Sequence, residues 1–396
     1  MTTRRNVLLL AGSGLVLAGC REPAQAAAAT APDVLLAESD RGLLRLGPSG
    51  EQVLGAAAAS FDGAHVYAAT DGRLDQVDPV SGAVVRSARI AGGWTPRVVA
   101  TDGRACALSR AGASDRPAAR ARTTLLVAGP AGEREYDLPG VIEPDAFTAD
   151  LTGLFVLDWL PATAPDHYRV RQLDLITGQV RPLITRTKVA IPAGAEEQMR
   201  GEGRQAVLSA DRKLLFTLYT HQPGHRHTRD LVSGRPGGAH AFVHVLHLSE
   251  GWAYCLDLPH PFGEGPAAGH ALAADARNLV VADLNAGRIA YANPESLTIE
   301  RVVDVPPVAG SAAALALTTD DRILIGAGGV TVLDRAPGRR TGRWELPGPV
   351  RGLALSRDGS RLHVGGTGRV TWLDARTGTR LGEVAVPGLT ALRHAA

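Results

Sequence analysis

Short apolar runs separated by compact glycine-containing turns make up most of this chain. The C-terminal part shows the pattern best: apolar runs at 351–356, 361–365, 369–374 and 381–386 follow one another, with turns at Asp358-Gly359 and Thr377-Gly378. Runs of this length between such turns are typical of β-strands. The segment therefore predicts a four-stranded meander.

The same unit recurs along the chain, marked each time by a pair of turns. Besides the C-terminal unit, these pairs lie at 60–63 with 78–82, 101–103 with 129–132, 148–150 with 174–178, 209–211 with 248–251, around 275 with 293–294, and around 319–320 with 334. A four-stranded unit repeated at this spacing indicates a ring of sheets, since each unit buries its faces against its neighbours.

The two ends of the chain supply the parts of an eighth unit. Apolar runs at 34–38, 43–46 and 52–54 lack an innermost strand, and a single strand-like run at 388–392 is followed by no partner. Joining these ends closes the ring and leaves no exposed strand edge. We predict an all-β fold, an eight-unit β-propeller formed by one domain at 33–396; seven blades is the alternative if one weak copy is only an insertion.

The turn motifs resemble those of the YVTN and WD40-like β-propellers of bacterial surface proteins. The resemblance covers roughly residues 33 to 394 and depends on the Ser-x-Asp-Gly turn at 356–359 and the Asp-x-x-Thr-Gly turn at 374–378. It implies the propeller fold and no particular function. In both motifs glycine provides a positive φ and aspartate binds backbone amides, which is turn chemistry.

The N-terminal segment predicts export and lipid anchoring. Arg4 and Arg5 precede 12 apolar residues at 7–18, and Leu17-Ala18-Gly19-Cys20 resembles a lipoprotein cleavage site. A membrane span needs about 20 apolar residues, so an uncleaved helix is disfavoured. We expect a twin-arginine-like signal peptide at 1–19, lipidation of Cys20, an Ala/Pro tether at 20–32, and an extracytoplasmic, membrane-anchored mature protein.

Composition and motifs narrow the function classes. The net charge of +2 provides no basic field for nucleic acid. The sequence contains no Gly-x-Ser-x-Gly, His-Glu-x-x-His or phosphate-loop motif, so no catalytic residue is predicted. Cys106 and Cys255 fall two units apart, too far for a disulfide, and are expected to be small buried hydrophobic residues.

Long insertions are expected on one rim of the ring. In a four-stranded meander, the loops between strands two and three and the links between units leave from the same side. The long segments all fall in these places, at 110–122, 159–167, 185–204, 220–240 and 259–270. Loops carried by a rigid scaffold are where binding residues concentrate, so we expect this face to be the binding face.

Histidines gather in the same region and suggest a metal site. His225 and His227 are two apart in a loop, with His221 nearby, and carboxylates are available from Glu196 and Glu197. Imidazole and carboxylate groups are ligands for zinc or copper. The alternative is a solvated polar loop without a metal.

Three further residues are candidate ligand contacts. We expect Trp94 and Trp159 in links on the binding face, where they can stack on a ligand. We place His270 near the central channel, where a hydrogen-bonded structural histidine is the alternative.

Two classes of function follow. One is a binding scaffold for a protein, peptide, glycan or other envelope ligand, without a cofactor and without chemistry. The other is a metal-handling propeller, either a zinc or copper carrier or a lactonase-like hydrolase, using His221, His225 and His227.

The anchoring prediction can be tested with the N-terminal segment alone. We expect a reporter fused to residues 1–30 to stay membrane-bound, and Cys20→Ser to release it, because the thioether to lipid is lost. Membrane fractionation measures the distribution. Release of both versions into the medium would contradict lipidation.

Overall fold

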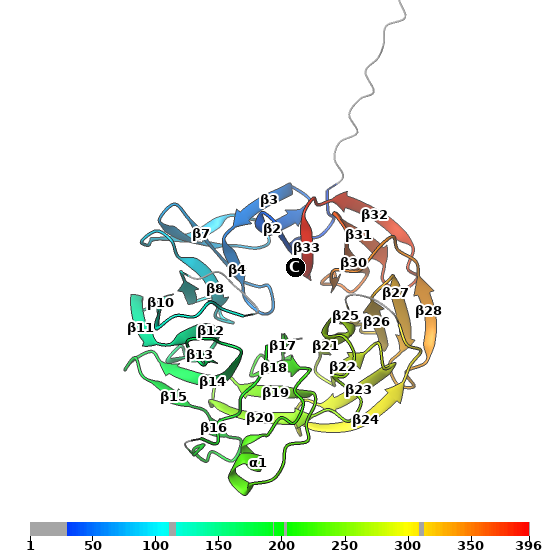
Figure 1. The fold of residues 1–396 in the computed structure, drawn as a ribbon. Helices are drawn as coiled ribbons and strands as arrows, with labels where there is room; N and C mark the ends of the chain where they lie inside the picture. The colour runs from blue at the N-terminus through cyan, green and yellow to red at the C-terminus, as the bar shows by residue number, and fades with distance from the viewer. Residues whose placement is uncertain (1–29, 111–115, 193, 202–203, 309–312, 396) are drawn as a thin grey trace, which may run out of the picture.

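Eight β-sheets form a ring (Figure 1). Residues of the inner strands line a central channel of about 1100 Å³. The computed structural model describes residues 30–110, 116–192, 194–201, 204–308 and 313–395. Within these residues the eight-bladed propeller is confirmed. The predicted signal peptide, Cys20 and most of the tether lie outside the described residues.

Blades two to eight are meanders whose first strand in the chain is the innermost, and in blade one the innermost strand is β33 (Leu389–Ala395). Blade one closes the ring with strands from both chain ends: β1 (Leu35–Ser39), β2 (Gly42–Gly47), β3 (Gly50–Gly55) and β33. Blade two contains β4 (Ala57–Ala59), β5 (Val66–Thr70), β6 (Arg73–Val77) and β7 (Val84–Arg89). Blade three contains β8 (Thr95–Val99), β9 (Cys106–Ser109), β10 (Arg122–Gly129) and β11 (Gly132–Pro139).

Blades four and five carry most of the irregular structure. Blade four contains β12 (Val141–Phe147), β13 (Gly153–Leu160), β14 (His167–Asp174) and β15 (Val180–Pro182). Blade five contains β17 (Gln205–Leu208), β18 (Leu214–Tyr219), β19 (Phe242–His247) and β20 (Trp252–Asp257), with the short β16 (Ile184–Thr185) added in parallel to β20. Helix α1 (Thr228–Ser233) lies between β18 and β19, and a 3₁₀ helix (Ala267–Gly269) precedes blade six.

The remaining blades are regular. Blade six contains β21 (His270–Ala274), β22 (Leu279–Asp283), β23 (Arg288–Asn293) and β24 (Thr298–Asp304). Blade seven contains β25 (Ala314–Leu317), β26 (Arg322–Gly326), β27 (Val330–Asp334) and β28 (Arg340–Trp344). Blade eight contains β29 (Leu353–Leu355), β30 (Arg361–Gly366), β31 (Arg369–Asp374) and β32 (Arg380–Ala385).

Side-chain oxygens fix the repeated turns. In the Ser-x-Asp-Gly turn, Ser356 Oγ donates to Asp358 Oδ1 at 2.6 Å, and the same oxygen accepts the Ser360 amide at 3.0 Å. Gly378 closes the other turn with φ 75°, and a Cβ there would come within 2.3 Å of the Trp344 ring. These aspartates and glycines are therefore structural, as the sequence predicted.

The apolar core is divided among the blade interfaces. Among the described residues, each of the eight interfaces between neighbouring blades holds one cluster of buried apolar side chains. The largest clusters include the blade four–five interface, with Phe155, Tyr168 and Phe242. A blade therefore buries both faces only when the ring is closed.

Backbone pairing and one partly buried carboxylate, Asp33, close the ring. β33 pairs antiparallel with β1, as the sequence predicted. Just before β1, Asp33 accepts hydrogen bonds from Arg361 Nε and His363 Nε2 of blade eight, each at 2.7 Å. The start of the chain is thus held by the blade that precedes it in the ring.

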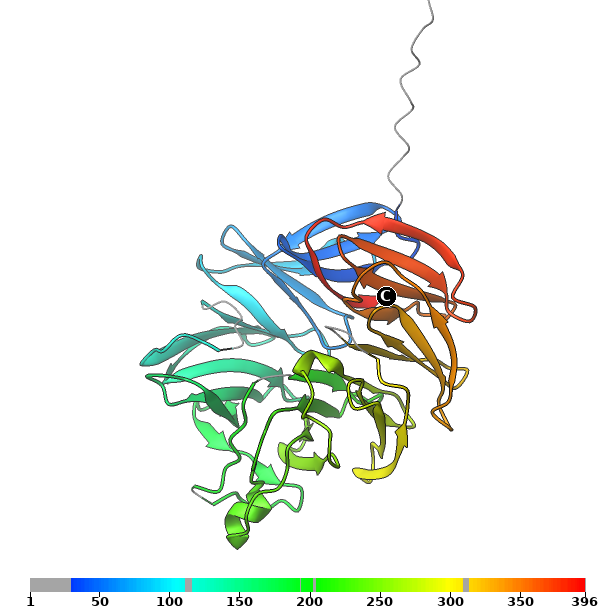
Figure 2. The same cartoon turned by 45° about the vertical axis from the view of Figure 1, so that its right-hand side comes forward.

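The insertions leave from one rim, as predicted. They join β9 to β10, β13 to β14 and β18 to β19, or link blade four to five and blade five to six. In the view turned by 45°, the insertions of blade five, with α1 at the bottom, project beyond the ring (Figure 2). No helix in the described part of the chain is long and apolar enough to span a membrane.

The Asp33 contacts provide a test of ring closure. We expect Asp33→Ala to lower the free energy of unfolding by about 1–3 kcal/mol, because it leaves Arg361 and the buried His363 without their acceptor. Urea unfolding followed by tryptophan fluorescence measures the change. The control Asp304→Ala removes an 82% exposed partner of Arg288 and should cost less than about 1 kcal/mol. Equal effects of the two substitutions would contradict the closing role of Asp33.

Candidate metal centre

Two insertions of blade five bring three possible metal ligands together. Glu197 comes from the link between blades four and five, and His225 and His227 come from the β18–β19 loop. One ligand atom from each residue lies within 4.8 Å of those of the other two. His225 and His227 are 7% and 2% exposed, so this is a buried group and differs from a solvated loop.

One carboxylate oxygen is the centre of the group. Glu197 Oε2 lies 3.4 Å from His225 Nε2, 3.2 Å from His227 Nδ1 and 2.9 Å from Cys255 Sγ. The other oxygen, Oε1, accepts the backbone amide of Thr228 at 2.8 Å. Both oxygens of a largely buried carboxylate are therefore satisfied by groups from two segments, the β18–β19 insertion and β20.

Local structure fixes the two imidazoles. His227 is the N-cap of α1, and the Asp230 side chain accepts its backbone amide, as in a capping box. Phe242 stacks on His225 at 4.4 Å between ring centroids and meets His227 edge-on at 5.1 Å. The orientation of both rings is thus set by packing before any ion binds.

The floor beneath the rings is the β19–β20 hairpin. Phe242 faces Asp257 across the strands, and His244 faces Cys255. His227 Nε2 lies 2.5 Å from Asp257 Oδ1, and Arg229 forms an ion pair with the same carboxylate. An imidazole that binds metal through one nitrogen and donates to a carboxylate through the other is the usual arrangement in metal sites.

The charges of the group follow from its burial and its contacts. Burial opposes ionisation of Glu197, but hydrogen bonds from His225, His227 and Cys255 hold the pKa of Glu197 well below its usual range. Burial also opposes the charge of His227, yet Asp257 and Glu197 raise the pKa of His227 to about 9. Burial, together with the Glu197 charge, raises the pKa of the Cys255 thiol well above its usual value, so Cys255 is a protonated donor to Glu197.

Two of the three separations between ligand atoms match those around a tetrahedral ion, and all three atoms lie within 4.8 Å of one another. A tetrahedral Zn²⁺ with Zn–N and Zn–O bonds of about 2.0–2.1 Å places its ligand atoms about 3.3 Å apart. The Glu197–His225 and Glu197–His227 separations are 3.4 Å and 3.2 Å. Three protein ligands leave a fourth position for a water or another ligand, which is the open type of zinc site.

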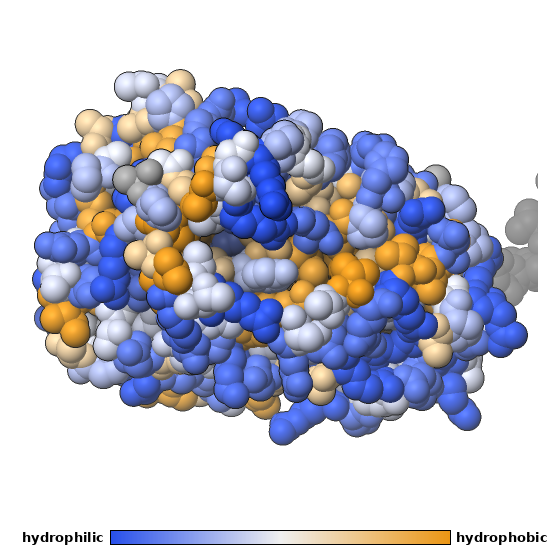
Figure 3. All heavy atoms as spheres, turned by 90° about the horizontal axis from the view of Figure 1, so that it is seen from below, coloured by the Kyte–Doolittle hydropathy of each residue, from blue (hydrophilic) through white to orange (hydrophobic). Residues whose placement is uncertain are grey.

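An apolar pocket of about 540 Å³ borders the group. Glu197, His227 and Cys255 line it together with apolar side chains from both insertions and β20. Figure 3 looks onto the edge of the ring that carries these insertions, where hydrophobic residues form a band bordered by hydrophilic ones. His225 instead borders a second cleft of about 350 Å³ with His167 and Gln222.

The structure brings together three of the five predicted metal candidates, Glu197, His225 and His227. Glu196 points away and binds Arg169 Nη1 and Arg171 Nε, each at 2.9 Å. His221 lies beside His270, with its Nδ1 2.8 Å from Thr220 Oγ1. Neither belongs to the group formed by Glu197, His225 and His227.

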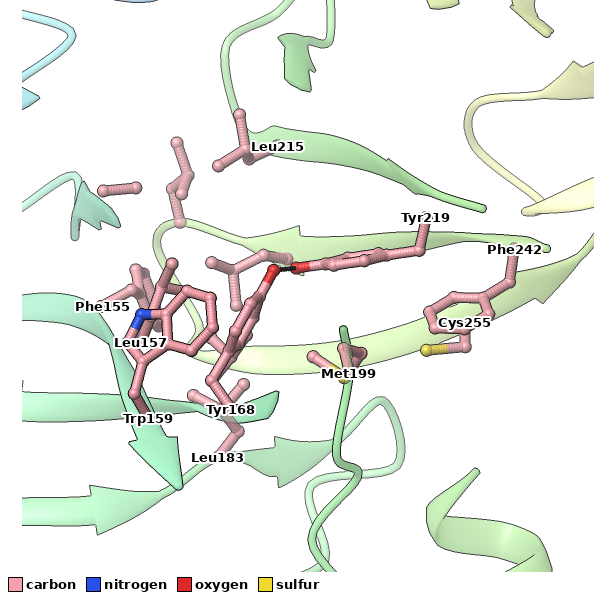
Figure 4. Packing of buried hydrophobic residues seen from close by; sticks show 14 of the residues in the cluster. Phe155, Leu157, Trp159, Tyr168, Leu183, Met199, Leu215, Tyr219, Phe242 and Cys255 are labelled. Carbon is pink, nitrogen blue, oxygen red and sulfur yellow. Dashed lines mark hydrogen bonds between the residues drawn. The ribbon is translucent and has the colours of Figure 1, made fainter. Parts of the chain in front are cut away.

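The predicted aromatic contacts are buried in the structure. Trp94 lies in a link as expected, but it is 4% exposed and Arg110 covers its ring at 4.2 Å. Trp159 was expected in a link and this was wrong: it belongs to β13, where it packs on Tyr168 of β14 at 4.7 Å. Figure 4 shows Trp159 against Tyr168, and the Tyr168 and Tyr219 hydroxyl groups in hydrogen-bond contact at 2.9 Å.

His270 is fully buried at the start of β21. Its Nε2 lies 3.0 Å from Asp283 Oδ2 and accepts the Gly263 amide at 3.0 Å. These contacts are those expected of a hydrogen-bonded structural histidine, which was the alternative to a ligand-binding role for His270. The two remaining cysteines are free and buried, as predicted.

The sequence analysis missed Phe242, Cys255 and Asp257. Cys255 and Asp257 are two apart in one strand, so they share a face, and Phe242 and His244 share a face of the neighbouring strand. The sequence did contain a signal for these residues. It places an acidic residue, a thiol and a histidine on one face of a hairpin, next to a histidine-rich loop. Their pairing across strands depends on register, which the sequence does not state.

Comparison with known proteins supports the fold. No family model matches the chain, and no curated protein matches it by sequence. Among solved structures, apo AztD from Citrobacter koseri aligns with a TM-score of 0.54 at 10% identity, covering 92% of this chain and 97% of that one. A second AztD structure from the same organism gives a TM-score of 0.54 at 12% identity and covers 92% and 96% of the two chains.

A third similar structure is the dihydro-heme d1 dehydrogenase NirN in complex with DHE. It aligns with a TM-score of 0.54 at 13% identity, covering 94% of this chain and 77% of NirN. At these identities the likeness extends to the β-propeller fold and no further.

The protonation of His227 gives a testable pH dependence in the metal-free protein. Glu197, Asp257 and His225 face this imidazole, and Arg229 pairs with Asp257. Since the pKa of His227 rises from about 6.5 to about 9 on folding, its stabilisation is complete below pH 6.5 and is lost as pH rises through 9. In EDTA, we expect His227→Gln to lower Tm more at pH 6.5 than at pH 9.5.

The matched control is His260→Gln, whose side chain is 78% exposed; it should leave Tm unchanged at both pH values. A His227→Gln deficit that is constant or grows with pH would contradict the proposed charge state.

Proposed function

We propose that this chain is a lipid-anchored, extracytoplasmic binding protein whose ligand is a divalent transition metal ion, zinc in the first place. The observation that carries the proposal is the convergence of Glu197, His225 and His227 ligand atoms within 4.8 Å in a buried setting. The anchoring part rests on the N-terminal segment and Cys20 alone.

The donor set favours zinc over magnesium or calcium. Two imidazoles and one carboxylate suit zinc and copper, whereas magnesium and calcium prefer oxygen ligands. The Glu197–His225 and Glu197–His227 separations of 3.4 and 3.2 Å suit a tetrahedral ion, which favours zinc over copper(II), an ion that prefers tetragonal geometry. The supporting contacts, from Asp257 to His227 and from Cys255 to Glu197, are those that orient ligands around an ion.

The sequence predicted a binding scaffold in the first place and a metal-handling propeller in the second, and the proposed function combines the two. In this proposal the insertion-rich face binds a metal ion and catalyses no reaction. A lactonase-like hydrolase remains the second candidate, because the three ligands leave a fourth position next to a pocket. It needs the same ion, so turnover of a lactone that stops in Glu197→Gln is the result that would favour it.

Metal analysis tests the proposal directly. We expect residues 21–396 to bind one zinc ion per chain and each of Glu197→Gln, His225→Gln and His227→Gln to weaken binding at least about 100-fold. Asp257→Asn, which removes only a supporting contact, should cost about 10–100-fold. Competition with a chromophoric chelator and elemental analysis measure affinity and stoichiometry.

The matched control is His221→Gln, from the same loop but outside the group. It should leave affinity unchanged. A wild-type chain that binds no zinc, or a Glu197→Gln variant that binds it as tightly as the wild type, would rule the proposal out.

A further inference from the structure

The pocket beside the metal ligands has apolar walls and a polar floor. Leu183, Ala190, Ile191, Met199, Val232 and Tyr254 contribute to the walls, whereas Glu197, His227 and Cys255 lie among its polar residues. Its volume of about 540 Å³ is within the range of sites for small organic ligands. A metal ion alone needs no such space.

Two valines that line this pocket have exposed side chains. Val189 and Val232 are 59% and 61% exposed, although they come from two different insertions. Large apolar side chains that converge on one hollow from separate loops mark a binding surface more than a solvated one. The walls therefore fit an apolar ligand body.

The charge of the proposed metal centre indicates the chemistry of the ligand's head group. With Glu197 as the anionic ligand and two neutral imidazoles, a divalent ion keeps a net charge of +1. Asp257, the carboxylate that His227 Nε2 contacts, adds a negative charge that Arg229 balances. Uncompensated charge is costly in a buried site. Cys255 does not supply the missing anion, since its thiol donates a hydrogen bond to Glu197 Oε2 at 2.9 Å. One monoanionic donor in the fourth position would neutralise the centre.

We propose that this pocket binds a small organic molecule with an apolar body and a monoanionic, metal-coordinating head group, and that the head completes the coordination of the ion held by Glu197, His225 and His227. This inference rests on the proposed metal function. On binding, the head loses its proton to solvent and replaces water at the ion, and the apolar body displaces water from the walls.

Hydroxamates of different length test the inference, because they share one head group. The probes are octanohydroxamate and acetohydroxamate, added to the cobalt(II)-loaded chain, whose visible absorption reports changes at the ion. We expect octanohydroxamate to bind at least tenfold more tightly, since only its chain reaches the apolar walls. Val232→Asp should reduce this preference at least threefold without changing metal content.

The matched control is Val85→Asp, a valine of blade two that is 60% exposed and lies outside the pocket; it should keep the full preference. Equal affinity for the two hydroxamates, or no spectral change with either, would overturn the inference while leaving the metal site in place. Equal binding of octanohydroxamate by metal-free His227→Gln would also overturn it, because the head would then not coordinate the ion. A wild-type chain that takes up no metal would refute the proposed function itself.

Discussion

Closure of the ring is the constraint on which the rest of this structure depends. Every blade interface holds an apolar cluster, so an open ring would expose two blade faces to water together with an unpaired strand edge. The chain avoids this by giving blade one three strands from its beginning and one, β33, from its end. Asp33 adds a charged contact to blade eight at the same seam.

The candidate metal centre depends on the rigidity that ring closure provides. Glu197 belongs to the link that enters blade five, and the two histidines belong to a loop inside that blade, so their separation is set by how blades four and five pack. The packed row at this interface runs from Trp159 and Tyr168 to Tyr219 and Phe242, with centroid separations of 4.7, 6.2 and 5.3 Å. Phe242 ends the row and stacks on His225. The packing of the core thus directly fixes the position of the candidate ligand His225.

Glu197 is the least replaceable group of the centre. Burying a carboxylate is costly unless donors surround it, and here two imidazoles, a thiol and a helix-terminal amide do so. In the metal-free protein the positive charge that balances it is a proton on His227. In the proposed metal-bound state, the ion would take over the role of that proton.

Much of the fold could be predicted from the sequence, because its signals are local. Turn residues such as Asp358, Gly359 and Gly378 act on their own neighbours, and their repetition gave eight units and the shared first blade. The candidate site was predictable only in part. His225 and His227 were found because two residues of one loop stay close in any fold, and Glu197 because it lies in the adjacent insertion.

The residues that were predicted wrongly or missed all depend on contacts between separate segments of the chain. Glu196 and Glu197 are neighbours in the chain, but opposite directions of their side chains send one to Arg169 and Arg171 and the other to the histidines. Trp159 extends a strand because Tyr168 pairs with it. Cys255 and Asp257 enter the centre through the register of β19 and β20. By itself, the sequence determined the repeating unit, the ring and the rim that carries the insertions; the tertiary structure decided which side chains meet, because that choice depends on packing between segments far apart in the chain.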